Sequence, residues 1–209
     1  MRALIYKDLL ALLKYCRFHL GLCGVFLVAT AFLGNMEFMR TYVLVFTSMM
    51  PATLIAYEET ERWDRTALTM PLSRRMIVTE KYVVGMLLQL TALVLICFSW
   101  VVQMMRAGQF DVSALMSELL MNLVLAIIMP SLMMPVVFKL GAERGRTALT
   151  LVLCGAMAVI VGGTAALGSI GAFLDVDAAV AMPLAVSVVV LMYPISWMLA
   201  VHWYEKREF

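Results

Sequence analysis

Six long apolar runs constrain the fold more than any other feature of the sequence. They cover about residues 18–35, 40–57, 82–105, 113–138, 147–171 and 179–203. A helix needs about 20 mostly apolar residues to cross the hydrocarbon core of a bilayer. The chain has 209 residues, of which 64% are hydrophobic and 14% are charged. A soluble domain of this size could not bury so much apolar surface. The sequence therefore predicts an all-α polytopic membrane protein, with six transmembrane helices in a single transmembrane domain over residues 1–209.

Several prolines fall inside these runs, among them Pro51, Pro130, Pro135 and Pro194. Proline breaks helices in soluble proteins, because it lacks a backbone N–H and its ring clashes with the preceding turn. In a membrane bundle, neighbouring helices can satisfy the backbone groups that proline frees. We therefore expect these prolines to kink the helices rather than to end them.

The basic residues predict the orientation of the chain. With both termini inside, 14 of the 16 lysines and arginines lie in the predicted cytoplasmic segments, and only Arg40 and Arg106 lie outside. Basic residues are enriched in the cytoplasmic segments of membrane proteins. The sequence thus predicts a multi-pass protein of the bacterial cytoplasmic membrane with both termini in the cytoplasm.

Residues 2–17 precede the first apolar run and form an amphipathic pattern. On a helical wheel the apolar side holds Ile5, Leu9, Leu12, Leu13 and Cys16. The opposite, polar side holds Lys7, Asp8, Ala11 and Lys14. This pattern is typical of an interfacial helix on the cytoplasmic leaflet. The alternative is a cytosolic helix that packs on a partner.

The segment 58–81, between the second and third runs, is rich in charge. If residues 58–70 are helical, Glu58 pairs with Arg62 and Glu61 with Arg65 at i,i+4 spacing. A second face of this short helix then carries an exposed stripe of Trp63, Ala67 and Met70, suited to docking on a cytosolic protein. Pro71 closes the helix, and Ser73 can cap the next one. The plain alternative is a solvated loop with no docking role, which is basic only because cytoplasmic segments of membrane proteins are enriched in basic residues.

Several kinds of chemistry are missing from the sequence. It has no G-x-x-x-x-G-K-[ST] motif, so it cannot hydrolyse ATP in the manner of P-loop enzymes. The four cysteines lie in or beside apolar runs without metal-binding spacing, so we predict neither a metal site nor a catalytic site. A net charge of +2 does not indicate binding to nucleic acid.

Polar, small and methionine residues inside the runs are candidates for lining a path or an interface. They are Thr47, Ser48, Met49, Asn122, Met129, Gly155, Gly162 and Gly163. Polar groups at membrane depth face the bundle, and small residues let helices approach closely. Methionine suits a variable apolar cargo. The alternatives are polar contacts between helices and methionines that only fill gaps around the prolines.

The charged segment also carries a family resemblance. Its pattern is acid-acid-x-x-x-Trp-x-x-x-x-Leu-x-x-Pro-Leu-Ser-Arg-x-x-Ile-Val-x-x-Lys-Tyr, formed by Glu58, Glu59, Trp63, Leu68, Pro71, Leu72, Ser73, Arg74, Ile77, Val78, Lys81 and Tyr82. Together with the opening MRALIYKDLL, it resembles the small ABC-2 type permeases of bacterial exporters, including the branch similar to phenol-soluble-modulin and lantibiotic-type peptide exporters. Met70 departs from the leucine common before the proline, and Glu80 adds a charge beside Lys81.

The resemblance implies a fold similar to type V ABC exporters, in which residues 2–17 form a connecting helix. It implies that the segment 58–70 acts as a coupling helix on a separate ABC ATP-binding subunit. The contact residues would be Glu58, Glu59, Glu61, Arg62, Trp63, Arg65, Ala67 and Met70. ATP and Mg²⁺ would then bind to that partner, and this chain would hold no cofactor.

Two functions from different classes follow. The first is the non-catalytic permease subunit of an ATP-driven exporter, which pairs with a second identical or homologous permease chain. Its cargo would be hydrophobic or amphipathic, with peptides as one candidate class. The second is a non-transporting membrane scaffold or immunity protein that recruits a cytosolic partner through the charged segment.

Overall fold

The computed structural model describes residues 2–33, 37–61, 63, 73–108, 111–141, 143–145, 147–148 and 178–206. The long helices in these ranges are α1 (Arg2–Tyr15), α2 (Arg17–Leu33), α3 (Glu37–Thr60), α5 (Arg74–Ala107), α6 (Val112–Leu140) and α8 (Ala178–Glu205). No strand occurs in the described part of the chain, so the all-α prediction is confirmed there.

Three of these helices are long and apolar enough to cross a membrane: Met39–Thr60, Arg74–Ala107 and Leu115–Leu140. The count rises to four if α1 and α2, which meet at an angle of 76°, form one bent span. The predicted sixth span, 179–203, falls within α8. The fifth, 147–171, lies almost wholly outside the described residues, so the total of six spans stays a prediction.

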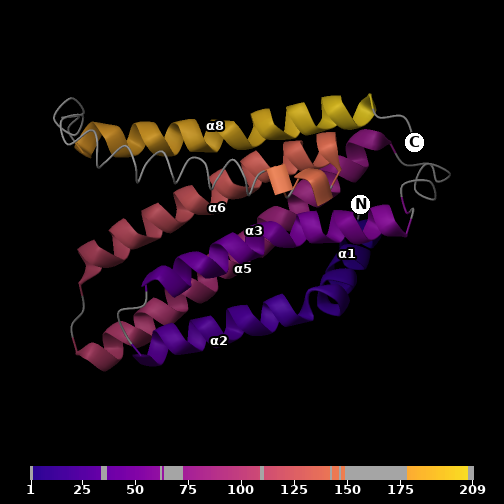
Figure 1. Cartoon of the computed structure of the whole chain (residues 1–209). Helices are drawn as coiled ribbons and strands as arrows, with labels where there is room; N and C mark the ends of the chain where they lie inside the picture. The colour runs from indigo at the N-terminus through magenta and orange to yellow at the C-terminus, as the bar shows by residue number, and fades with distance from the viewer. Residues whose placement is uncertain are drawn as a thin grey trace.

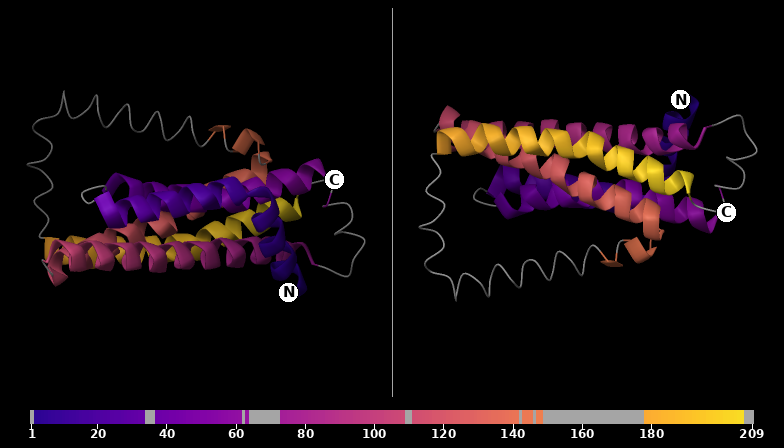
Figure 2. Two further views of the ribbon diagram at one scale, coloured as in Figure 1. Left: turned by 90° about the horizontal axis from the view of Figure 1, so that it is seen from below. Right: turned by 90° about the horizontal axis from the view of Figure 1, so that it is seen from above.

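The helices α2, α3, α5, α6 and α8 lie alongside one another, and both chain termini lie at one end of this bundle (Figures 1 and 2). We call it the basic end, because its described residues include Lys7, Lys14, Arg17, Arg74, Arg75, Lys81, Lys139, Arg144 and Lys206. The opposite end, here the far end, holds Arg40 and Arg106. Among the described residues, the unequal distribution of basic residues that the sequence predicts is therefore present along the bundle axis.

Helices continue through the prolines. Pro51 lies inside α3, Pro130 and Pro135 lie inside α6, and α8 runs past Pro194. The prediction that these residues do not end the helices is confirmed.

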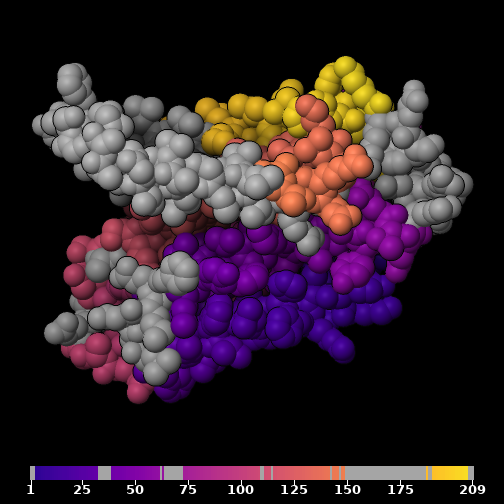
Figure 3. Space-filling view, in the orientation of Figure 1, coloured from indigo at the N-terminus to yellow at the C-terminus, as the bar shows by residue number. Residues whose placement is uncertain are grey.

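Figure 3 shows α1 and α2 packed directly against α3 on one face of the molecule. The buried core forms two clusters, and α5 contributes to both of them.

The structure shows which residues of α1 face the bundle, which the wheel does not predict. Leu12 and Cys16 are buried, Leu9 and Leu13 are exposed, and the side chain of Asp8 is completely buried. The cause is an ion pair: Asp8 meets Lys81 of α5, which turns part of the polar side toward the bundle. The exposed leucines on the other side still suit an interfacial helix.

The predicted coupling helix also begins differently. Residues 58–60 are the last turn of α3 rather than the start of a separate helix. Arg62, Arg65, Ala67 and Met70 lie outside the described residues. Ser73 does cap α5, because its side chain accepts a hydrogen bond from the backbone N–H of Met76 at 3.3 Å. The predicted role of Ser73 is therefore confirmed.

Candidate functional site

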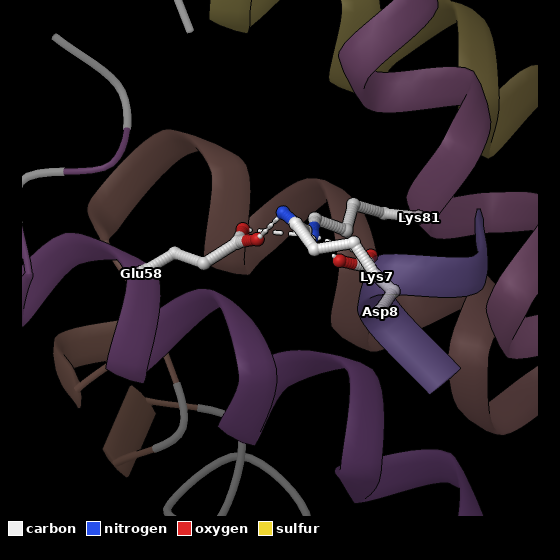
Figure 4. A network of polar contacts seen from close by, with 4 residues as sticks. All are labelled: Lys7, Asp8, Glu58 and Lys81. Carbon is white, nitrogen blue, oxygen red and sulfur yellow. Dashed lines mark hydrogen bonds and ion pairs between the residues drawn. The ribbon is translucent and has the colours of Figure 1, made fainter. Parts of the chain in front are cut away.

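Four charged side chains from three helices meet at the basic end. Lys7 Nζ lies 2.5 Å from Glu58 Oε1 and 3.1 Å from Asp8 Oδ1. Lys81 Nζ lies 2.5 Å from Asp8 Oδ2 and 2.8 Å from Glu58 Oε2. Each lysine therefore contacts both carboxylates, and Figure 4 shows the two amino groups between them. We call these four residues the inner ion cluster; it joins α1, the end of α3 and the start of α5.

Burial makes the inner ion cluster important for the structure. The side chains of Asp8 and Lys81 are 0% and 2% exposed, and that of Glu58 is 14% exposed. Charges removed from water are costly unless they are paired and hydrogen bonded. In the inner ion cluster the positive charges of two lysines lie in direct contact with the negative charges of two carboxylates. The arrangement therefore links the three helices: moving α3 or α5 away leaves an unequal number of buried charges, and moving α1 away breaks the contacts of Asp8 with Lys81 and of Lys7 with Glu58.

Lys7 links the inner ion cluster to Trp63. Its Nζ lies 4.1 Å from the centroid of the Trp63 ring, a distance typical of a cation–π contact. Burial lowers the pKa of Lys7, but the hydrogen bond and the charge of Glu58 raise it by more, so the pKa lies above its usual value. Lys7 is thus a cation at neutral pH that touches both the last turn of α3 and the following segment.

Trp63 differs from the sequence prediction of an exposed residue. Its side chain is partly buried, and it packs against the core cluster that contains Ile55, Ile77 and Val137. In addition, Lys7 Nζ lies over the indole ring. Only part of Trp63 is therefore available to another protein.

A recess of about 350 Å³ opens between α1 and the end of α3, beside Trp63. Its wall includes Tyr15 and Tyr57, whose rings stack with centroids 4.3 Å apart. Tyr15 also donates a hydrogen bond to Glu61 at 2.9 Å. The recess combines aromatic rings with charged groups at its edge, which is a surface chemistry suited to protein contact.

The predicted contact residues thus divide into groups. Glu58 belongs to the inner ion cluster, where its partners are Lys7 and Lys81. Its predicted pairing with Arg62 stays a prediction, because Arg62 lies outside the described residues. Glu59 is partly buried, and Glu61 is exposed at the recess. The remaining predicted residues, Arg62, Arg65, Ala67 and Met70, are not described, so the docking stripe stays a prediction.

The candidate path residues in the described structure lie on α3 and α6. Thr47 and Ser48 are buried in α3 and donate to carbonyl groups of their own helix, at 2.7 Å each. Met49 packs against a core cluster, and Asn122 is buried in α6. Met129 of α6 is partly buried. Gly155, Gly162 and Gly163 lie outside the described residues, so the path prediction is untested.

A second polar cluster, which the sequence did not reveal, lies toward the far end. Arg40 of α3 is 2% exposed, and its Nε lies 2.8 Å from Glu118 Oε1 of α6. The same guanidinium donates a hydrogen bond to Gln103 Oε1 of α5 at 2.6 Å. We call these three residues the outer polar cluster. It joins α3, α5 and α6, just as the inner ion cluster joins α1, α3 and α5.

The sequence carries only faint signals for these two clusters. Asp8 is an acid within an otherwise apolar and basic helix, and Lys81 follows a helix cap by two turns. Glu118 is the one charged residue within the apolar run 113–138, and it lies inside α6. Within the described residues, no group of three or more histidine, cysteine, aspartate or glutamate side chains is placed to hold a metal ion.

Comparison with known proteins identifies the family. The model of the ABC-2 family transporter protein matches residues 3–205, almost the whole chain. No curated protein and no solved structure gave a match. The matched region includes every helix that contributes to the two polar clusters, as well as the helices long enough to span a membrane. The chain belongs to the ABC-2 transporter family, as a membrane component of the permease type.

Proposed function

We propose that the chain is the permease subunit of an ATP-driven exporter and is coupled to a separate ATP-binding subunit at its basic end. Family membership supports the permease role, and the sequence has no P-loop of its own. The observation that carries the proposal is the inner ion cluster, which ties the end of α3 to α1 and α5. A force applied beside Glu58 is therefore passed directly to two other helices.

The mechanism follows from these contacts. The ATP-binding subunit, with ATP and Mg²⁺, would contact the segment after α3, including Trp63 and the recess beside it. Lys7 contacts Trp63 and Glu58 together, so a displacement of the segment moves α1 and α3 as a unit. Lys81 then transfers that displacement to α5. ATP can shift the balance between two conformations of the permease only if the ATP-bound subunit binds them with different affinities. The size of the shift is set by that difference in affinity.

The remaining parts of the proposal concern partners, cargo and place. A second permease chain, identical or homologous, would complete the path. The cargo would be hydrophobic or amphipathic, with peptides as one candidate class. The basic end would face the cytoplasm of a bacterium, with both termini on that side, because basic residues concentrate on the cytoplasmic side of membrane proteins.

We expect Trp63→Ala to lower the stimulation of ATP turnover by the permease about fivefold or more, the range of ordinary coupling between sites. The measurement uses the full chain in nanodiscs together with the candidate ATP-binding subunit that co-purifies with it. Trp203→Ala is the matched control. Trp203 is also partly buried at the basic end, and Lys139 Nζ lies 4.7 Å from its ring centroid.

Three outcomes are informative. Loss of stimulation in the Trp63 variant alone supports coupling through the segment after α3. Equal loss in both variants means that a general change at the basic end causes it, which contradicts the proposal. If the ATP-binding subunit neither co-purifies with the wild-type chain nor responds to it, the exporter function fails and the scaffold function is favoured.

A further inference from the structure

A second recess, of about 280 Å³, lies between α5, α6 and α8. Short side chains on α6, Ala126 and Pro130, lie in its floor, and both are buried. Met86 and Leu90 of α5 and Val190 of α8 form its rim, and each is about half exposed. The recess therefore opens on the surface that the described helices α5, α6 and α8 form, rather than toward the inner ion cluster.

The lining of this recess presents only carbon. Gln89 and Tyr193 are the polar side chains among the lining residues, and both direct their polar groups elsewhere. Gln89 Nε2 donates to the carbonyl oxygen of Leu44 at 3.3 Å, and the Tyr193 hydroxyl donates to that of Tyr82 at 2.8 Å. Gln89 Oε1 is buried and not exposed in the recess. Such a recess offers water no hydrogen-bond partners, so it suits an apolar occupant.

The position of the recess along the bundle axis indicates which apolar molecule can occupy it. Leu90 lies near the middle of α5, and Pro130 and Val190 are far from the charged ends of α6 and α8. The α5 helix is long and apolar enough to span a membrane. At the middle of a spanning helix the surrounding medium is lipid hydrocarbon, and head groups lie at the ends.

We propose that this recess binds a single acyl chain of a membrane lipid, which enters sideways from the bilayer between α5 and α8. The acyl chain matches the recess in chemistry, because both present hydrocarbon surfaces. It also matches in position, because the recess lies near the middle of the spanning helix α5. Its carbon atoms supply the dispersion contacts that an unfilled space between two helices forfeits. The bound chain supports the packing of α5 and α8 over α6. This inference does not rest on the proposed function.

A lipid with a photoreactive diazirine near the middle of one acyl chain tests the proposal. The probe is such a phosphatidylcholine, mixed into nanodiscs of unlabelled phosphatidylcholine that contain the full chain. Leu87 is the matched control for Leu90: it lies on the same helix, at nearly the same depth, with 44% against 47% exposure, but outside the recess. Mass spectrometry should find labelling of Leu90 about fivefold above that of Leu87, equivalent to ~1 kcal/mol.

Two variants separate a bound chain from lipid that only surrounds the protein. Leu90→Trp fills the recess and should reduce the labelling of Val190 to the level of Leu87. Leu87→Trp adds the same bulk outside the recess and should leave the labelling of Val190 unchanged. Met86→Trp replaces Leu90→Trp if gel filtration shows that the latter is misfolded. Each variant is compared with the wild-type chain without any ATP-binding subunit.

Other occupants give different results. Equal labelling of Leu87 and Leu90 in the wild-type chain would show that no acyl chain is held, and the proposal would be wrong. Low labelling of both, together with disulfide-linked dimers of a Leu90→Cys variant, would assign the recess to a second copy of the chain. Retention of a molecule without a lipid head group, found by mass spectrometry of the purified chain, would assign the recess to cargo. Both of these results overturn the lipid proposal.

Discussion

Replacing Lys81 by methionine will lower the free energy of unfolding by about 3–5 kcal/mol, the usual cost of removing one partner from a buried ion pair. The substitution keeps most of the side-chain volume but leaves Asp8 and Glu58 facing a single cation, Lys7. Asp8 is completely buried, so water cannot replace the lost contact. The effect can be measured by chemical unfolding of the purified chain in mixed micelles.

The matched control is Arg75→Met on the same helix. Arg75 pairs with Glu205 at 2.8 Å, but their side chains are 70% and 40% exposed. Exposed ion pairs contribute little to stability, so we expect almost no change from this variant. A Lys81→Met variant as stable as Arg75→Met would show that the inner ion cluster does not hold the helices together.

A second substitution can restore the balance of charge. Asp8→Asn combined with Lys81→Met leaves Glu58 paired with Lys7, and so removes the uncompensated carboxylate. We expect the double variant to be more stable than Lys81→Met alone. A double-mutant cycle gives the interaction energy between Asp8 and Lys81 directly. If the two single effects simply add, the ion pair contributes no interaction energy of its own.

The sequence predicts the helices well because the bilayer leaves few alternatives. A chain that crosses hydrocarbon must satisfy its backbone hydrogen bonds within each segment. The apolar runs at 82–105 and 113–138 therefore lie inside α5 and α6. Their ends are less predictable: α5 begins at Arg74, because Ser73 caps it before the apolar run starts.

The clusters are harder to predict because they depend on how each helix is rotated about its axis. A helical wheel separates Asp8 from the apolar side of α1, but it does not show that Lys81 lies opposite. Arg40, Gln103 and Glu118 come from three segments that meet only after packing. Local patterns such as the Ser73 cap are fixed by neighbours in sequence, whereas these contacts are fixed by the assembled bundle.

Arg40→Met will lower stability by a similar amount, about 3–5 kcal/mol, because Arg40 is buried between two partners. Removing it leaves Glu118, at 21% exposure, without the guanidinium, and Gln103 without its donor. The measurement is again chemical unfolding in mixed micelles. Arg106→Met is the matched control at the far end. Arg106 is exposed and donates to the carbonyl oxygen of Phe32 at 3.2 Å, so its loss should change stability little.

The two clusters should differ in their effect on ATP turnover. Lys81→Met breaks the proposed link between the ATP-binding subunit and α5, so it should reduce the stimulation of that subunit as well as stability. Arg40→Met acts at the far end, where it leaves the inner ion cluster intact. At a temperature where both variants are folded, we expect stimulation to persist in Arg40→Met alone. Equal loss in both would mean that stimulation follows overall stability, and the inner ion cluster would have no special part in coupling.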